Sequence, residues 1–125
     1  MKKVAIYSRV ATVNEEFNVI EIQENSLIQF AVSRGYTNYA CYQDNGVKGF
    51  SLDRPGLNRM MADIRNGTID VVIVRDPDRI ARGMSLLIEW MDSVKDHGVE
   101  VIFANNNESV AESLTPIRTI MAGLK

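Results

Sequence analysis

The sequence predicts a single α/β domain, with a mostly parallel sheet of four to five strands and helices on both faces in a three-layer arrangement. Two observations carry this prediction. Short β-rich apolar runs alternate along the chain with segments of helical periodicity, which implies right-handed crossovers between parallel strands. The run from Ile69 to Val74 is almost continuously apolar, as a parallel strand buried on both faces requires. With 125 residues and 46% hydrophobic composition, the chain is long enough for one such core.

The first half of the chain is expected to form a strand, a helix, a second strand and a loop. Val4 to Val10 is rich in strand-forming residues, and Glu15 to Arg34 carries apolar residues at helical spacing. Gly35 is suited to end that helix. Tyr39 to Tyr42 indicates the second strand, and the glycines and short polar residues from Asp44 to Gly49 indicate an exposed loop.

The second half repeats the alternation. Pro55 suits the first turn of a helix that Asn66-Gly67 would end, and the apolar run described above follows as the third strand. Ser85 to His97 has the spacing of another amphipathic helix, and Val101 to Ala104 is the expected fourth strand. A further helix is expected to begin near Leu114 and to be cut short at the end of the sequence.

Composition narrows the class of protein. The net charge of -2 is the wrong sign for a domain that binds nucleic acid through its overall charge, so any DNA contact should be local. Cys41 is the single cysteine and has no partner for a disulfide, which fits a reducing, cytoplasmic location. No apolar run is long enough to span a membrane. Glycine-rich phosphate loops and a zinc ligand set are missing from the sequence, so we expect neither a nucleotide-binding loop nor a structural zinc site.

Arginines follow three of the predicted strands. Because the carboxyl ends of parallel strands share one edge of the sheet, these side chains should meet there and suit a phosphate group through their planar, permanently charged donors. Each arginine alone would be read as a surface residue paired with a carboxylate. The residues in question are Arg9, Arg54, Arg79 and Arg82, with Asp76 and Asp78 beside the last two. Gln23 falls on the inward stripe of the first helix, either as a site residue or as an interior amide.

Five segments resemble the motifs of serine site-specific recombinases of the resolvase/invertase family. Tyr7 to Thr12 resembles Y-x-R-V-S-T, and Gln23 lies where that family has a glutamine in its first helix. Asp44 to Gly49, followed by Asp53-Arg54-Pro55, resembles D-x-G-x-S-G and an acidic-R-P triplet, and Asp78 to Arg82 resembles D-R-L-[SA]-R. The match spans nearly the whole chain in order, and its style is nearest to the large phage- and transposon-type members.

The resemblance implies the N-terminal catalytic domain of such a recombinase, with a resolvase-like fold. Its activity would be cleavage and exchange of DNA strands at short recombination sites through a phosphoserine link, without metal or cofactor. The implied partners are double-stranded DNA, a second copy in a homodimer, and a tetramer during strand exchange. Residues 113–125 would begin the dimerisation helix, and the DNA-binding regions would lie outside the 125 residues. The implied site consists of the position of Ala11 with Arg9, Gln23, Arg54, Asp78, Arg79 and Arg82.

One position departs from the family pattern. The nucleophilic serine aligns with Ala11, whose methyl group cannot attack phosphorus, so this chain should not form the covalent link. Strand periodicity places Ser8 on the face opposite Arg9 and position 11, and Thr12 lies one residue further on, where a turn could reorient it. Lys48 replaces the usual loop serine, a milder change.

Either the serine was replaced on purpose, or this is a natural relative that has lost cleavage. Retention of the arginines favours a recent or deliberate change, because four like charges without a task would cost stability. Two other functions stay open: a non-catalytic, DNA-associated dimerisation or assembly module of the same fold, and, third, a flavodoxin-like domain that binds a small phosphorylated molecule.

Overall fold

The computed structural model describes residues 1–13, 18–105 and 108–109. Its centre is a five-stranded sheet in the order β2-β1-β3-β4-β5. The first four strands are parallel and β5 is antiparallel to β4. The strands are β1 (Val4–Val10), β2 (Tyr39–Asn45), β3 (Val71–Val74), β4 (Glu100–Phe103) and β5 (Glu108–Ser109).

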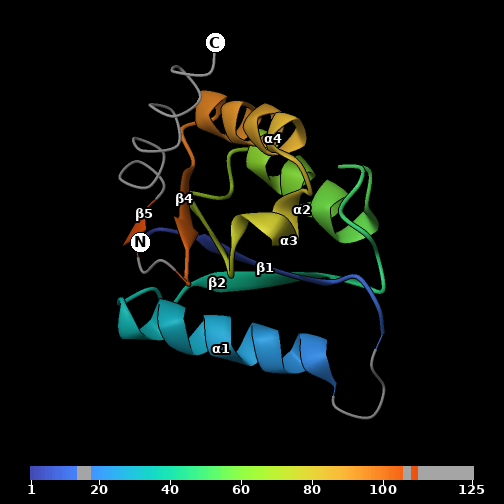
Figure 1. Ribbon diagram of the computed structural model, residues 1–125. Coiled ribbons are helices and arrows are strands. Elements are labelled where there is room, and N and C mark those ends of the chain that lie inside the picture. Colours follow the sequence, from blue (N-terminus) through green and yellow to red (C-terminus); the bar gives the residue numbers. More distant parts are fainter. Residues whose placement is uncertain (14–17, 106–107, 110–125) are drawn as a thin grey trace.

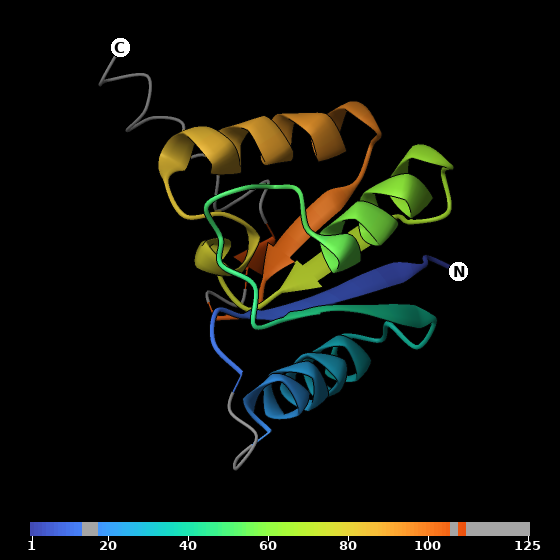
Figure 2. The same ribbon diagram turned by 90° about the vertical axis from the view of Figure 1, so that its right-hand side faces the viewer.

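Helices cover both faces of the sheet. The helix α1 (Val19–Ser33) lies alone against one face, and α2 (Pro55–Arg65), α3 (Pro77–Ile80) and α4 (Met84–Asp96) lie against the other (Figures 1 and 2). The predicted α/β class, the parallel sheet and the placement of helices on both faces are therefore confirmed.

Alternation along β1 gives the domain two apolar clusters, one on each face of the sheet. Val4 and Ile6 pack with Leu27 and Ala31 of α1. Ala5 and Tyr7 belong to the larger cluster beneath α2 and α4. All seven residues of β1 are buried, so its polar members, Ser8 and Arg9, lie inside the fold.

Several predicted boundaries change in the structure. The first helix begins at Val19 rather than Glu15, with 14–17 outside the described residues. The third strand begins at Val71 rather than Ile69. The second strand extends to Asn45, because Asp44 and Asn45 pair with the end of β1 instead of opening the loop.

Two further predictions concern segments after β3. The one-turn helix α3 was not predicted from the sequence, although Pro77 occupies its first turn. The helix expected near Leu114, and the boundary of 113–125 as a dimerisation segment, lie outside the described residues. Within the described part of the chain, no helix has the length and apolar character needed to cross a membrane.

Candidate active site: an arginine cluster at the carboxyl ends of the strands

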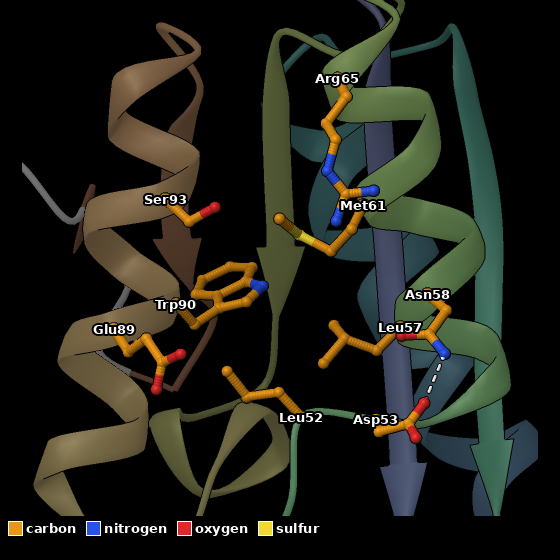
Figure 3. Close-up of a pocket in the computed structure, with 9 residues that line it drawn as sticks. All are labelled: Leu52, Asp53, Leu57, Asn58, Met61, Arg65, Glu89, Trp90 and Ser93. Carbon is orange, nitrogen blue, oxygen red and sulfur yellow. Dashed lines mark hydrogen bonds between the residues drawn. The ribbon is translucent and has the colours of Figure 1, made fainter.

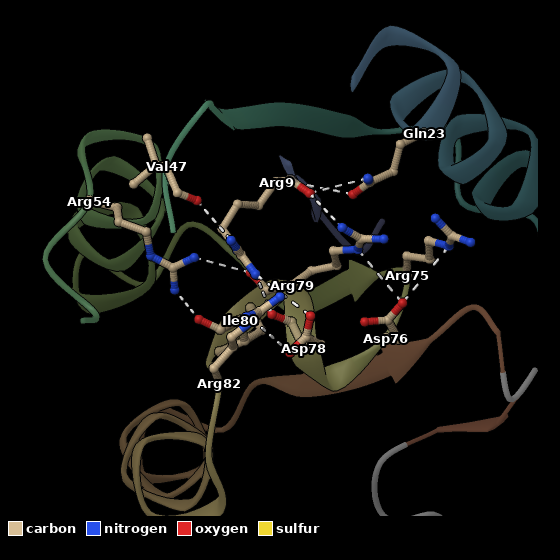
Figure 4. Close-up of polar contacts among 10 residues, drawn as sticks. All are labelled: Arg9, Gln23, Val47, Arg54, Arg75, Asp76, Asp78, Arg79, Ile80 and Arg82. Carbon is tan, nitrogen blue, oxygen red and sulfur yellow. Dashed lines mark hydrogen bonds and ion pairs between the residues drawn. The ribbon is translucent and has the colours of Figure 1, made fainter. Parts of the chain in front are cut away.

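The four predicted arginines meet at one edge of the sheet. Arg9 lies near the end of β1, Arg54 precedes α2, and Arg79 and Arg82 lie in and just after α3. Figure 4 shows their side chains gathered around α3. Arg9 and Arg54 are only 1% exposed, whereas the side chains of Arg79 and Arg82 are 23% and 52% exposed. The cluster therefore has a buried pair and a solvent-facing pair, which sequence order alone does not distinguish.

Each of the three nitrogens of the Arg9 guanidinium donates to a backbone carbonyl group. Its Nε donates to the carbonyl of Arg79 at 2.9 Å, Nη2 to that of Asp78 at 2.6 Å, and Nη1 to that of Val47 at 2.7 Å (Figure 4). Burial lowers the pKa of Arg9, and the neighbouring charge of Arg54 lowers it further. Arg9 thus connects β1 to α3 and to the loop after β2.

Arg54 bonds to the same short helix, partly at the same carbonyl as Arg9. Its Nη1 donates to the carbonyl of Arg79 at 3.1 Å, and its Nη2 donates to the carbonyl of Ile80. The extended backbone of Arg54, at φ -139, and Pro55 in the first turn place the guanidinium just before α2. Because α3 has a single turn, most of its carbonyls lack helical partners, and the two buried arginines satisfy them.

These bonds change what retention of the arginines means. Arg9 and Arg54 have a structural task whether or not the domain cuts DNA, because each bonds to backbone carbonyls of α3. Arg9 and Arg54 would therefore keep a task without cleavage, contrary to the expectation drawn from the sequence. Retention of Arg9 and Arg54 therefore does not favour a recent or deliberate loss of the serine.

Gln23 acts on the site through the backbone of Arg9. The side chain is 6% exposed on the inner stripe of α1. Its Oε1 accepts from the Arg9 N–H at 3.1 Å and its Nε2 donates to the Arg9 carbonyl at 3.2 Å (Figure 4). Arg79 Nη1 also donates to that carbonyl, at 3.2 Å. Gln23 consequently fixes the end of β1 at the point from which Arg9 projects.

Carboxylates balance the solvent-facing pair. Asp78, whose side chain is 55% exposed, lies 3.6 Å from Arg82 and 3.9 Å from Arg9. Asp76 lies 3.7 Å from Arg79 and 3.8 Å from Arg75. These distances, 3.6 to 3.9 Å, are longer than those of close hydrogen-bonded ion pairs, so an incoming anion can compete for the guanidiniums.

Sequence reasoning missed a buried, hydrogen-bonded pair formed by Tyr7 and Asp44. The buried Asp44 carboxylate accepts from the Tyr7 hydroxyl at 2.6 Å and from the N–H groups of Gly56 and Leu57 at 2.7 and 2.9 Å. Burial and the bond to Asp44 raise the pKa of Tyr7. An anion at a helix N-terminus is stabilised by the helix dipole. Asp44 therefore anchors the start of α2, the helix that follows Arg54 in the chain.

A close backbone approach accompanies this anchor. A Cβ atom on Gly56 would lie 2.3 Å from the carbonyl oxygen of Gln43, so only glycine lets α2 begin so near β2. The available signal was Asp44 in a loop-like motif, but its partners are 12, 13 and 37 residues away. Spacing rules for helix caps do not reach that far.

Ala11 follows the end of β1, two residues after Arg9, and is partly exposed. Thr12 is exposed, and Ser8 is fully buried within the sheet. The Ser8 hydroxyl has no hydrogen-bond partner among the described residues. A buried hydroxyl cannot contact a DNA strand while β1 stays in the sheet. Ser8 therefore cannot supply the hydroxyl that position 11 lacks.

A groove of ≈ 330 Å³ lies elsewhere, between α2 and α4 (Figure 3). Leu57, Met61 and Trp90 line it, with Asp53 and Glu89 among its polar residues. None of the predicted site residues lines this groove. Among the described residues, no group of three or more histidine, cysteine, aspartate or glutamate side chains is arranged to hold a metal ion.

Known proteins resemble this chain in both sequence and fold. The chain is 34% identical over 104 residues to a Bacillus subtilis (strain 168) protein named "Putative DNA recombinase", covering 82% of this chain and 20% of that protein. It is 27% identical over 107 residues to the transposon Tn552 DNA-invertase BinR of Staphylococcus aureus, covering 86% of this chain and 50% of that one. The match therefore covers about a fifth of the first relative and half of the second.

The structural comparison covers the whole domain. The N-terminal catalytic domain of TP901-1 integrase superposes with a TM-score of 0.85 at 29% identity, covering 98% of this chain and 93% of that one. The family model for the N-terminal domain of resolvases matches residues 4–125. The chain therefore belongs to the resolvase family and corresponds to the N-terminal catalytic domain of its serine recombinases.

Proposed function

We propose that this domain binds the scissile phosphodiester of a DNA recombination site with its arginine cluster, and that Ala11 prevents it from cutting that bond. The observation that carries the proposal is the gathering of four guanidiniums at the edge of the sheet where β1 ends, in a chain whose net charge is -2. The cluster is a local positive site on a mildly acidic domain. A substrate of this kind places the protein with the DNA of the cell, in the cytoplasm.

The two pairs of arginines would contribute differently. Arg79 and Arg82 are exposed enough to donate directly to phosphate oxygens. Arg9 and Arg54 lie beneath them, add positive potential, and hold the short helix that presents the other two. Preorganised cations of this type stabilise the charge that develops on a transferring phosphoryl group. Asp78 would orient the group or supply a proton, and Gln23 would keep Arg9 in place.

Cleavage requires a nucleophile that this chain lacks. With serine at position 11, its oxygen would form a bond to phosphorus while the bond from phosphorus to one deoxyribose oxygen breaks. The serine proton would leave with a base or water, and the departing oxygen would take up a proton to become a hydroxyl. The phosphodiester energy would be kept in the phosphoserine link, so strand exchange would need no cofactor.

The test is restoration of the nucleophile. We expect Ala11→Ser, in a longer protein that also carries the DNA-binding regions, to form an adduct with its recombination site that survives denaturing electrophoresis. Adding Arg79→Ala to that variant should abolish the adduct. If the serine variant binds its site and forms no adduct, the catalytic proposal is wrong.

The alternative is a non-catalytic module that dimerises with, or regulates, an active recombinase. Ala11 is the observation that favours it. In that case Ala11→Ser restores no cleavage, the source gene itself encodes alanine at codon 11, and the chain still joins a dimer or a synaptic tetramer. Sedimentation of the chain with and without an active recombinase would detect that association.

A further inference from the structure

Phe50 is the most exposed aromatic side chain in the described part of the chain, at 65%. It lies in the loop between β2 and α2, one residue after Gly49. Isolated apolar residues on a protein surface are common and need no explanation by themselves. The position of Phe50 relative to the arginine cluster is what gives it significance.

Two contacts place the ring at the rim of the cluster. The Arg82 N–H donates to the Gly49 carbonyl at 2.9 Å. The guanidinium carbon of Arg82 lies 5.7 Å from the centroid of the Phe50 ring. The ring therefore borders the arginine that is best placed to reach a phosphate from solvent.

The loop also lies directly on the buried Arg9. A Cβ atom on Gly49 would be 2.9 Å from Nη2 of Arg9 and 3.3 Å from the backbone nitrogen of Arg82. The Val47 carbonyl accepts from Arg9 as well. The backbone on the N-terminal side of Phe50 is thus fixed on the cluster, and the ring projects beyond it.

We propose that Phe50 packs against the nucleoside next to the phosphate that the arginine cluster binds. A phenyl ring has no hydrogen-bonding group, so it would accept any base and would not read sequence. Aromatic side chains hold bases by their faces, and apolar side chains can also enter between base steps. Arg82 and Phe50 would then hold neighbouring parts of one nucleotide, its phosphate and its nucleoside. This inference rests on the phosphodiester site proposed above.

Two small probes separate the nucleoside contact from the phosphate contact. Dimethyl phosphate offers the phosphodiester alone, and the thymidine dinucleotide offers the same group with nucleosides on both sides. Chemical-shift titrations of the 125-residue chain would give both affinities. We expect the dinucleotide to bind more tightly by at least about fivefold, the lower end of what stacking of one base provides.

Variants test whether the ratio of the two affinities depends on Phe50. Phe50→Ala should bring the ratio close to one, and Phe50→Trp should keep it. Tyr39→Ala is the matched control: Tyr39 is also an exposed aromatic residue, at 38%, but it begins β2 and so lies at the opposite end of the sheet. The control should leave the ratio unchanged.

The outcomes are distinguishable. An undiminished ratio in Phe50→Ala would overturn the nucleoside contact while the phosphodiester site stands. Failure of both probes to shift any resonance of the wild-type chain would overturn the phosphodiester site, and the nucleoside contact with it. A ratio near one in the wild-type chain would overturn the nucleoside contact alone.

Discussion

Gln23 pairs with Arg9 as a neighbouring strand would, with one bond to the backbone N–H and one to the carbonyl. On that side of β1 the strand β3 ends its pairing at Tyr7. The amide of Gln23 therefore replaces the missing strand at the point where the sheet gives way to the site.

Removal of this amide should destabilise the domain. Gln23→Ala leaves the buried Arg9 N–H without an acceptor, so we expect a loss of about 1–3 kcal/mol in the free energy of unfolding. Urea denaturation followed by circular dichroism measures this loss. Gln29→Ala, on the exposed face of the same helix, should change stability by no more than about 0.5 kcal/mol. Equal effects of the two variants would contradict the strand-like role of Gln23.

The buried and solvent-facing arginines should respond differently to lysine. Arg54→Lys keeps the charge but loses the two-pronged contact with the carbonyls of Arg79 and Ile80, and should cost about 1–3 kcal/mol in unfolding free energy. Arg82→Lys, half exposed, should change stability by less than about 0.5 kcal/mol. In an Ala11→Ser background both should slow adduct formation. A stability loss in the Arg82 variant that matched the Arg54 variant would contradict this division.

Tyr7 should make the domain sensitive to alkaline pH. Its pKa is raised by burial and by the bond to Asp44, so the folded chain keeps a proton that the unfolded chain releases near pH 10.0. Tyr7 makes its full contribution to the free energy of unfolding below that pH. The contribution falls by about 1.4 kcal/mol for each pH unit above it. Tyr7→Phe should make the decline above about pH 10 shallower by that amount. Unfolding by urea at a series of pH values tests the slope.

Tyr42 provides a second measurement of the same kind. Burial raises its pKa, and its hydroxyl donates to Asp63 at 2.5 Å. Tyr42→Phe should therefore reduce the slope again, and the double variant should show both reductions. If neither variant altered the slope, the alkaline loss of stability would have another origin.

Gly56 should resist replacement by alanine, although alanine is the better helix former. Helix propensity alone would favour Gly56→Ala by about 1 kcal/mol. The added methyl group would meet the backbone of Gln43, and we expect a net loss of about 1–3 kcal/mol in thermal or urea unfolding. Arg59→Ala, exposed on the same helix, is the control and should be close to neutral. A stabilised Gly56→Ala variant would show that α2 can move away from β2.

Local periodicity was sufficient to predict the main elements of the fold. Strands β1, β3 and β4 are rich in strand-forming residues, and α1, α2 and α4 each have an inward stripe at helical spacing. The carboxyl-edge rule for parallel sheets also indicated where the arginines would meet. These inferences needed only near neighbours in the sequence and the order of the elements.

The remaining features depend on partners distant in sequence. One turn of helix, as in α3, is too short to show a period, and its carbonyls are bound by arginines 25 and 70 residues away. The last residues of β2 have loop-like composition, and pairing with β1 makes them a strand. Which arginines are buried follows from the same contacts, so the sequence pattern could not separate Arg9 and Arg54 from Arg79 and Arg82.

The structural role of Arg9 and Arg54 bears on how such domains evolve. A lineage that lost its nucleophile would keep both arginines under purifying selection, because their loss would leave the turn after β3 without its hydrogen bonds. Arg79 and Arg82 carry less of that constraint and would drift first. Across descendants with alanine at position 11, variation confined to the solvent-facing pair would therefore record an old loss of cleavage, and invariance of all four a recent one.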